Sequence, residues 1–253
     1  MRLTVHPRAL LVLLLPVAVV LVLVSLVATL VGLASPGGAP FEGYERLMDV
    51  VSVDEETTVP SWFSASLLLL CALLLLDVAR TARARRDRWR YHWALLTLVF
   101  AYLSADEGSR LHEIGTSVVE MAGIDTGLRF SWVLVALPVA AVFALAMVPF
   151  LLALPRRTAL LFVLAGCVYV GAAAGLEVVG SAVAPLEEGS TTAGYAALTS
   201  VEELFEMVGA ILFAWAVADH QRRAVAAAAA ADARSGSATR ARQGEHAAPA
   251  RVA

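Results

Sequence analysis

Residues 9–34, ALLVLLLPVAVVLVLVSLVATLVGLA, decide the fold class of this chain. The stretch holds no charged residue and exceeds the about 20 residues that a helix needs to cross a bilayer. Lipid leaves the backbone only helices and closed barrels, and the stretch lacks the alternating pattern of barrel strands. It is also about twice as long as the apolar region of a signal peptide, and no A-x-A site closes it. We therefore expect an all-α transmembrane bundle, with residues 1–34 forming a cytoplasmic N-terminus and a retained signal anchor.

The rest of the chain repeats this apolar character. Of its 253 residues, 59% are hydrophobic and only 16% are charged, and the mean hydropathy is +0.75. A soluble domain has about 25% charged residues. Cys71 and Cys167 fall inside apolar blocks, and we expect both to be small core residues. Six blocks predict six transmembrane helices, at residues 9–34, 60–79, 91–113, 130–154, 158–184 and 198–219.

The arginines set the predicted orientation. Every basic residue is arginine, and the connection after the second block, RTARARRDRWR at residues 80–90, is the densest basic segment. All arginines except Arg46, Arg110 and Arg129 fall on the same side of the predicted bundle. Since cytoplasmic loops are rich in Lys and Arg, both termini are predicted to be cytoplasmic, in a multi-pass protein of the bacterial inner membrane.

Two segments lie outside the predicted membrane region of residues 60–219. Residues 35–59 form an acidic outer loop, in which we expect a short helix around residues 44–51. Residues 220–253 are rich in Ala and Arg; their Ala run can extend the last helix by a few turns, and the rest, with little to bury, is expected to be a disordered cytoplasmic tail. The arginines of the 80–90 connection and of the tail are expected to touch anionic lipid headgroups. Lipid is the predicted partner, nucleic acid is not, and the sequence does not set the oligomeric state.

Acidic residues gather at one depth in the predicted membrane. At about 1.5 Å per residue, Asp106 and Glu107 lie roughly 22–24 Å above the cytoplasmic end of their helix, and Glu177 roughly 28 Å. Glu206 lies roughly 21 Å and Glu203 roughly 25 Å above the end of the last helix. The hydrocarbon core is about 30 Å thick. Three helices therefore bring carboxylates to the outer third of the membrane.

Charged groups inside a membrane are costly and indicate function. The favoured hypothesis is an outer-facing cation-binding site, and a metal-dependent catalytic site is its more specific form. Oxygen ligands with one imidazole suit a divalent Mn, Fe, Mg or Ca ion better than structural zinc, and such a metal can activate water. Arg110 is predicted to orient the carboxylates or act as their counter-ion. The predicted metal ligands are Asp106, Glu107, His112, Glu113, Glu177, Glu203 and Glu206.

Two other hypotheses remain open. Buried carboxylates also suit a proton- or cation-coupled transporter, although the inner half of the helices shows no matching polar residues. Alternatively, Arg110 or Arg129 pairs with the acids and fixes the end of a structural or sensor protein. Helix capping offers a local explanation of Glu203, because Ser200 and Glu203 fit a capping box. The third helix can also end at Gly108, which would place the residues after it in a loop.

Three segments together resemble a family of uncharacterised bacterial multispanning membrane proteins. They are TTVPSWFSASLLLL at residues 57–70, LSADEGSRLHE at 103–113 and EELFEMVGAILF at 202–213. They match a pattern with a P-[ST]-aromatic turn, a D-E…H-E motif and an E-E-x-x-E motif. The resemblance covers residues 54–213 and implies membership of a helical membrane family without implying an activity. It adds Glu55 or Glu56 as a further member of the outer site.

Overall fold

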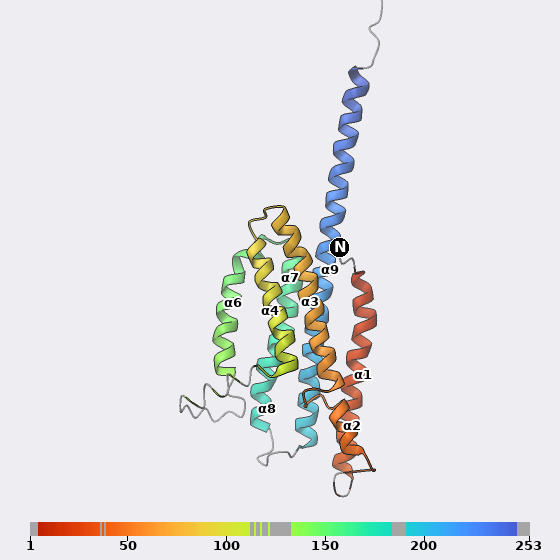
Figure 1. Ribbon diagram of the computed structural model, residues 1–253, viewed down its shortest axis with the longest axis vertical. Coiled ribbons are helices and arrows are strands. Elements are labelled where there is room, and N and C mark those ends of the chain that lie inside the picture. Colours follow the sequence, from red (N-terminus) through yellow and green to blue (C-terminus); the bar gives the residue numbers. More distant parts are fainter. Residues whose placement is uncertain are drawn as a thin grey trace, which may run out of the picture.

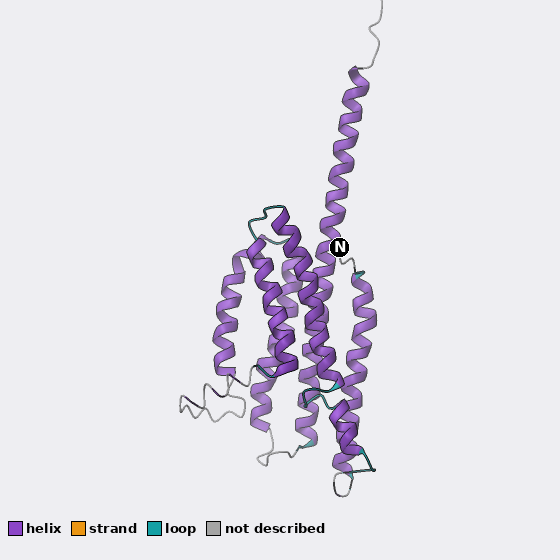
Figure 2. Cartoon of the chain, viewed as in Figure 1, coloured by secondary structure: helices purple, strands orange, loops and turns teal. Residues whose placement is uncertain are grey.

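Helices make up all the regular structure in the described part of the chain (Figures 1 and 2). The computed structural model describes residues 5–35, 37, 39–111, 114, 117, 121, 133–183 and 191–246. Within these residues the prediction of an all-α protein is confirmed. The helices are α1 (Pro7–Ala34), α2 (Tyr44–Val51), α3 (Val59–Ala84), α4 (Arg90–Ser109), α6 (Val133–Ala153), α7 (Arg156–Val170), the π-helix η2 (Gly171–Leu176), α8 (Glu177–Val183) and α9 (Ala193–His246).

Four of these helical segments are long and apolar enough to cross a membrane. They are α1, α3, residues Val135–Ala153 of α6, and Arg156–Gly180, which runs from α7 through η2 into α8. α4 and the first half of α9 carry more polar residues and lie beside these four in Figure 1. The short helix expected in the first outer loop is present as α2.

α9 is the centre of the packing. It contacts α1, α7 and α3, while α3 packs most extensively against α4. Buried positions on α9 recur at steps of three and four residues, which is the spacing of one helix face. Together with Cys71 and its neighbours on α3, they form the core of the bundle. These α9 positions are Met207, Ala210, Ile211, Ala214 and Val217.

The backbones of α7 and α9 approach closely at Gly209. A Cβ atom on Gly209 would lie 2.8 Å from both the Cβ and the backbone N of Tyr169. Small residues permit such close crossings of membrane helices. The prediction of a core cysteine is right for Cys71, which is buried, and wrong for Cys167, which is exposed. Cys167 lies off the face of α7 that carries the buried Phe162 and Ala165.

α9 continues far beyond the bundle. It runs unbroken for 54 residues, so that the segment 220–246 is helical and the expected disordered tail does not begin at residue 220. The difference has a local cause, because this segment contains the run AVAAAAAADA and alanine has the highest helix propensity. Low hydrophobicity argues against a packed core, but it does not argue against a solitary helix.

α6 is attached to the bundle mainly at its end nearest α7. Its only buried residues among those described are Met147 and Phe150. The Phe150 ring is fully buried among aromatic rings of α4 and the turn before it. Ring centroids of Trp93, His92 and Trp89 lie 4.8, 5.4 and 5.8 Å away. Phe150 therefore anchors α6.

Candidate outer carboxylate site

α4 ends earlier than the predicted block. Its last helical residue is Ser109, and Arg110 adopts a left-handed conformation with φ 52°. The Arg110 N–H donates to the Asp106 carbonyl oxygen at 2.8 Å, which closes the helix. The helix therefore ends one residue after Gly108, close to the alternative end expected from the sequence. His112 and Glu113 lie outside the described residues.

Arg110 forms an ion pair with the first outer loop. Its Nε lies 2.6 Å from Oε2 of Glu56, and the two side chains are 44% and 24% exposed. Exposed pairs of this kind contribute about 0.2–1 kcal/mol. Glu56 is one of the two loop acids that the family resemblance adds to the site. Arg110 thus joins the end of α4 to the loop before α3.

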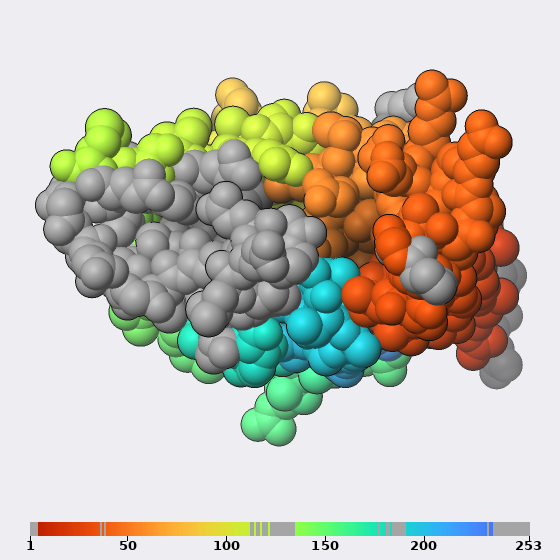
Figure 3. Space-filling model, turned by 90° about the horizontal axis from the view of Figure 1, so that it is seen from below, coloured from red at the N-terminus to blue at the C-terminus, as the bar shows by residue number. Residues whose placement is uncertain are grey.

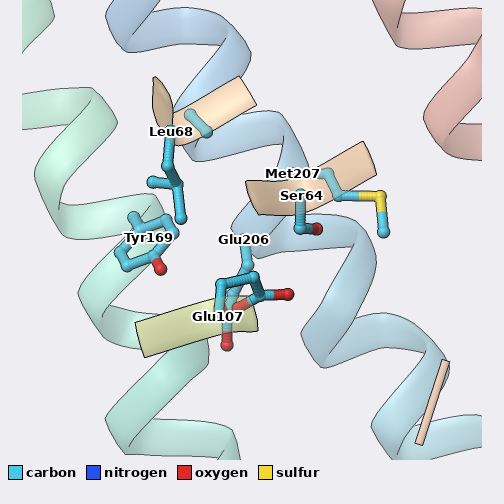
Figure 4. A pocket seen from close by; sticks show the side chains of 7 residues that line it. Ser64, Leu68, Glu107, Tyr169, Glu206 and Met207 are labelled. Atoms are coloured by element: carbon cyan, nitrogen blue, oxygen red, sulfur yellow. The ribbon is translucent and has the colours of Figure 1, made fainter. Parts of the chain in front are cut away.

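A pocket between four helices brings Glu107 and Glu206 together. Figure 4 shows their side chains next to one another, with Tyr169 on one side and Ser64 on the other. The space between the lining side chains has an empty volume of ≈ 170 Å³, which includes space open to solvent. The lining residues are Ser64, Leu68, Glu107, Tyr169, Glu206, Met207 and Ala210.

Further acidic groups surround this pocket. The Glu203 carboxyl lies within electrostatic range of Glu206, Glu107, Glu202 and Asp54. The Tyr169 hydroxyl lies within electrostatic range of Asp106 as well as of Glu107 and Glu206. Four of the predicted site residues, from α4 and α9, thus gather at the end of the bundle where α4 ends and α9 begins. They are Asp106, Glu107, Glu203 and Glu206.

Ser64 is a pocket residue that the sequence analysis missed. Its side chain lies on α3, is only 6% exposed, and its Oγ has no hydrogen-bond partner among the described residues. An unsatisfied buried hydroxyl costs about 1–3 kcal/mol. The available signal was a serine inside the apolar part of α3, three residues after the Ser61 of the helix cap. Tyr169 was missed for a different reason, because an aromatic residue in an apolar helix is normally interpreted as part of the hydrophobic core.

α9 begins earlier than expected, and this excludes the capping-box explanation of Glu203. The helix starts at Ala193, where Thr192 Oγ1 accepts the N–H of Tyr195 at 3.2 Å. Ser200 and Glu203 therefore lie in later turns, whose N–H groups already have helical partners. The Tyr195 hydroxyl donates to Oδ1 of Asp54 at 3.2 Å. Figure 3 shows the start of α9, in cyan, beside the first outer loop, in orange.

The structure describes the side chains of only some of the predicted metal ligands. Glu177 is the first residue of α8, and its side chain is not among those described. Within the described residues, no three His, Cys, Asp or Glu side chains have an arrangement that holds a metal ion. The described carboxylates and hydroxyls offer oxygen ligands only, which suit protons and hard cations better than soft metals.

Comparison with known proteins identifies the family and adds no activity. No curated protein and no solved structure matches the chain. Residues 12–221 match the family described as Domain of unknown function (DUF8692). This match takes in α1 to α8 and the bundle part of α9, including every described residue of the carboxylate pocket. The chain therefore belongs to the DUF8692 family.

Proposed function

We propose that this protein is a membrane protein whose outer carboxylate pocket binds a cation. The observation that carries the proposal is the pocket itself. Glu107 and Glu206 come from two different helices, and they line it together with the buried Ser64 hydroxyl that has no hydrogen-bond partner. A cation bound there would be coordinated by oxygen atoms of the two carboxylates and of the Ser64 hydroxyl.

The charge around the pocket supports a cation in preference to an anion. Glu206, Glu107 and Asp54 act electrostatically on Glu203, whereas Arg110 pairs with Glu56. Ionisable groups within a membrane bundle are costly and are retained for function. Two carboxylates and two hydroxyls provide oxygen ligands for a proton or a small hard ion. Hydrolysis at the site, or transport through it, would both begin with this binding step.

We expect cation binding to stabilise the folded protein through Glu206. A ligand at about 100 times its dissociation constant stabilises the protein by about 2.7 kcal/mol. Thermal unfolding in detergent, measured over a range of pH and with Na⁺, Ca²⁺ or Mn²⁺ added, will show this gain in wild-type protein and not in Glu206→Gln. Glu45→Gln on α2 is the matched control, because Glu45 is an exposed outer glutamate.

The same measurement separates binding from a structural role. If Glu206→Gln lowers stability under every condition and no cation or pH change distinguishes it from wild type, the carboxylates only fix the bundle and the proposal fails. If Glu206→Gln is as stable as wild type without cation, or more so, and no longer responds to one, the binding role stands. Removing one of two neighbouring negative charges relieves their repulsion.

We also propose that the bundle crosses the membrane six times with both termini in the cytoplasm of a bacterial inner membrane. Figure 1 shows the α3–α4 turn, the α6–α7 turn, the start of α1 and the extension of α9 at the same end of the bundle. The arginine-rich 80–90 connection and Arg156, Arg157, Arg222 and Arg223 belong to this end. Cytoplasmic loops carry such an excess of arginine.

Reporter fusions test this topology. A fluorescent protein that matures only in the cytoplasm should be active after Arg90 and after His246, and inactive after Val51. Alkaline phosphatase, which needs the oxidising outer side, should show the opposite pattern at all three positions. Cytoplasmic activity at Val51 would mean that the topology is wrong.

A further inference from the structure

α4 and α9 face each other in three layers that repeat every seven residues. Seven residues make about two helical turns, so residues at this spacing share one face. On α4 the repeat links the pocket to the opposite end of the helix, and the antiparallel α9 carries a matching repeat. The α4 residues are Glu107, Phe100 and Trp93, and the α9 residues are Glu206, Phe213 and His220.

The outer layer is the carboxylate pocket, and the middle layer is purely aromatic. The rings of Phe100 and Phe213 are stacked with their centroids 4.3 Å apart. Phe162 of α7 closes the layer with a centroid 4.6 Å from that of Phe213. Seven residues along α7 lead from Phe162 to Tyr169, which lines the pocket. Three helices thus supply one aromatic barrier about 10 Å below the carboxylates.

The inner layer places an imidazole beneath the aromatic barrier. The centroid of the His220 ring lies 5.2 Å from that of Trp93, and its Nδ1 lies 3.4 Å from Thr158 Oγ1. Asp219, next in the chain, pairs with Arg157 of α7 and Arg223 of α9. On the α3 side, Gln221 donates to Oδ2 of Asp77 at 3.2 Å. A second polar layer therefore exists at the cytoplasmic end of the same axis.

We propose that this axis is a proton path, with the Phe100–Phe213 pair as its barrier. The inference rests on the proposed cation site, which becomes the outer proton station. Glu107 and Glu206 exchange a proton with the outer side, and His220 exchanges it with the cytoplasm. Each event moves one proton from one side to the other and leaves both stations in their starting protonation states. Neither station needs an oxidant, reductant or second substrate.

The two stations and the aromatic barrier between them indicate that the transported species is a proton. Carboxylate and imidazole side chains both bind and release protons in proton relays, whereas a hard metal ion prefers oxygen ligands to the imidazole of His220. The layer below the pocket is closed by the stacked rings of Phe100 and Phe213. A hydrated ion therefore finds no passage, and a proton passes only when the rings separate enough to admit a chain of water.

Reconstituted vesicles test the path. The full-length protein is placed in liposomes with an internal pH-sensitive dye, and a potassium gradient with valinomycin drives proton entry. Phe213→Ala should raise the proton flux at least about tenfold over wild type, since this factor corresponds to about 1.4 kcal/mol of barrier. Adding Glu206→Gln to Phe213→Ala should return the flux to the wild-type level or below, and adding His220→Gln should reduce it.

Phe205→Ala is the matched control, because Phe205 lies on the same helix and is 47% exposed. It should leave the flux unchanged. A Phe213→Ala flux that equals that of Phe205→Ala, or that persists with Glu206→Gln, would overturn the path. Phe213→Leu, a smaller change, replaces Phe213→Ala if the latter is not recovered as a single folded species, and it should show a smaller increase with the same Glu206 dependence.

The outcomes for the path and for the cation site are distinguishable. If cations or pH stabilise the wild type through Glu206 but Phe213→Ala opens no flux, the site stands and the path is wrong. If sodium flux rises with Phe213→Ala while proton flux does not, the opened route carries metal ions and the proton assignment is wrong. If neither binding nor flux depends on Glu206, both proposals fail.

Discussion

Replacing Gly209 by alanine is expected to destabilise the protein by about 1–3 kcal/mol, the usual cost of overpacking a close-packed interior. The added Cβ would lie 2.8 Å from the Cβ and backbone N of Tyr169. Backbone atoms cannot rotate away as a side-chain end can, so α7 and α9 must separate. Because Tyr169 lines the pocket, the same shift should weaken cation binding. Thermal unfolding in detergent, with and without cation, measures both effects.

Gly166→Ala is the control for this substitution. Gly166 lies on α7, and a Cβ there meets no heavy atom within 4 Å. Alanine is favoured over glycine in a helix by about 1 kcal/mol, so Gly166→Ala should keep or raise the unfolding temperature. Equal effects of the two substitutions would show that helix propensity, and not the approach of α7 to α9, determines the result.

Phe150→Ala is expected to cost about 3–5 kcal/mol, as for other fully buried aromatic residues. Phe150 fills the space between Trp89, His92 and Trp93, and it is the largest buried side chain of α6. Its loss leaves α6 with few buried contacts to α4. We expect a lower unfolding temperature and a faster cleavage of the chain by protease near the ends of α6.

Leu152→Ala provides the comparison within the same helix. Leu152 is 81% exposed and loses little contact with the protein on truncation. The unfolding temperature of the Leu152→Ala variant should stay close to that of the wild type. If Leu152→Ala and Phe150→Ala shift the unfolding temperature equally, α6 is held by lipid and by its connections, and not by the aromatic cluster.

The helical class and the position of α2 were predictable because they depend on local patterns. An uncharged run as long as residues 9–34 is typical of a membrane-spanning helix. The ends of helices were less predictable, because they depend on single residues and on contacts distant in the chain. Arg110 ends α4 in a left-handed conformation that arginine does not favour, and its partner Glu56 lies on another loop.

The candidate site was predictable in part. Counting residues placed Glu107 and Glu206 at one depth, and they do line one pocket. Counting could not find Ser64 or Tyr169, since a serine or tyrosine in an apolar helix has many roles and only tertiary packing selects one. The polar layer around His220 was overlooked because its contacts join three helices, α9, α7 and α3. The seven-residue repeats of α4 and α9 were nevertheless visible in the sequence.

The π-helix η2 has a consequence for how the span from Arg156 to Gly180 can be compared with other chains. A π-type turn closes its hydrogen bonds at i→i+5 and so accommodates one surplus residue compared with an α-helix. One residue corresponds to about 100° of rotation, as an α-helix has 3.6 residues per turn. Val170 before η2 and Val178 after it are eight residues apart, and they therefore lie at nearly the same angle around the helix axis, as residues seven apart do in an α-helix. A relative that lacks one residue of GAAAGL and forms an unbroken α-helix here would therefore keep the residues on both sides of the gap on the same helix faces.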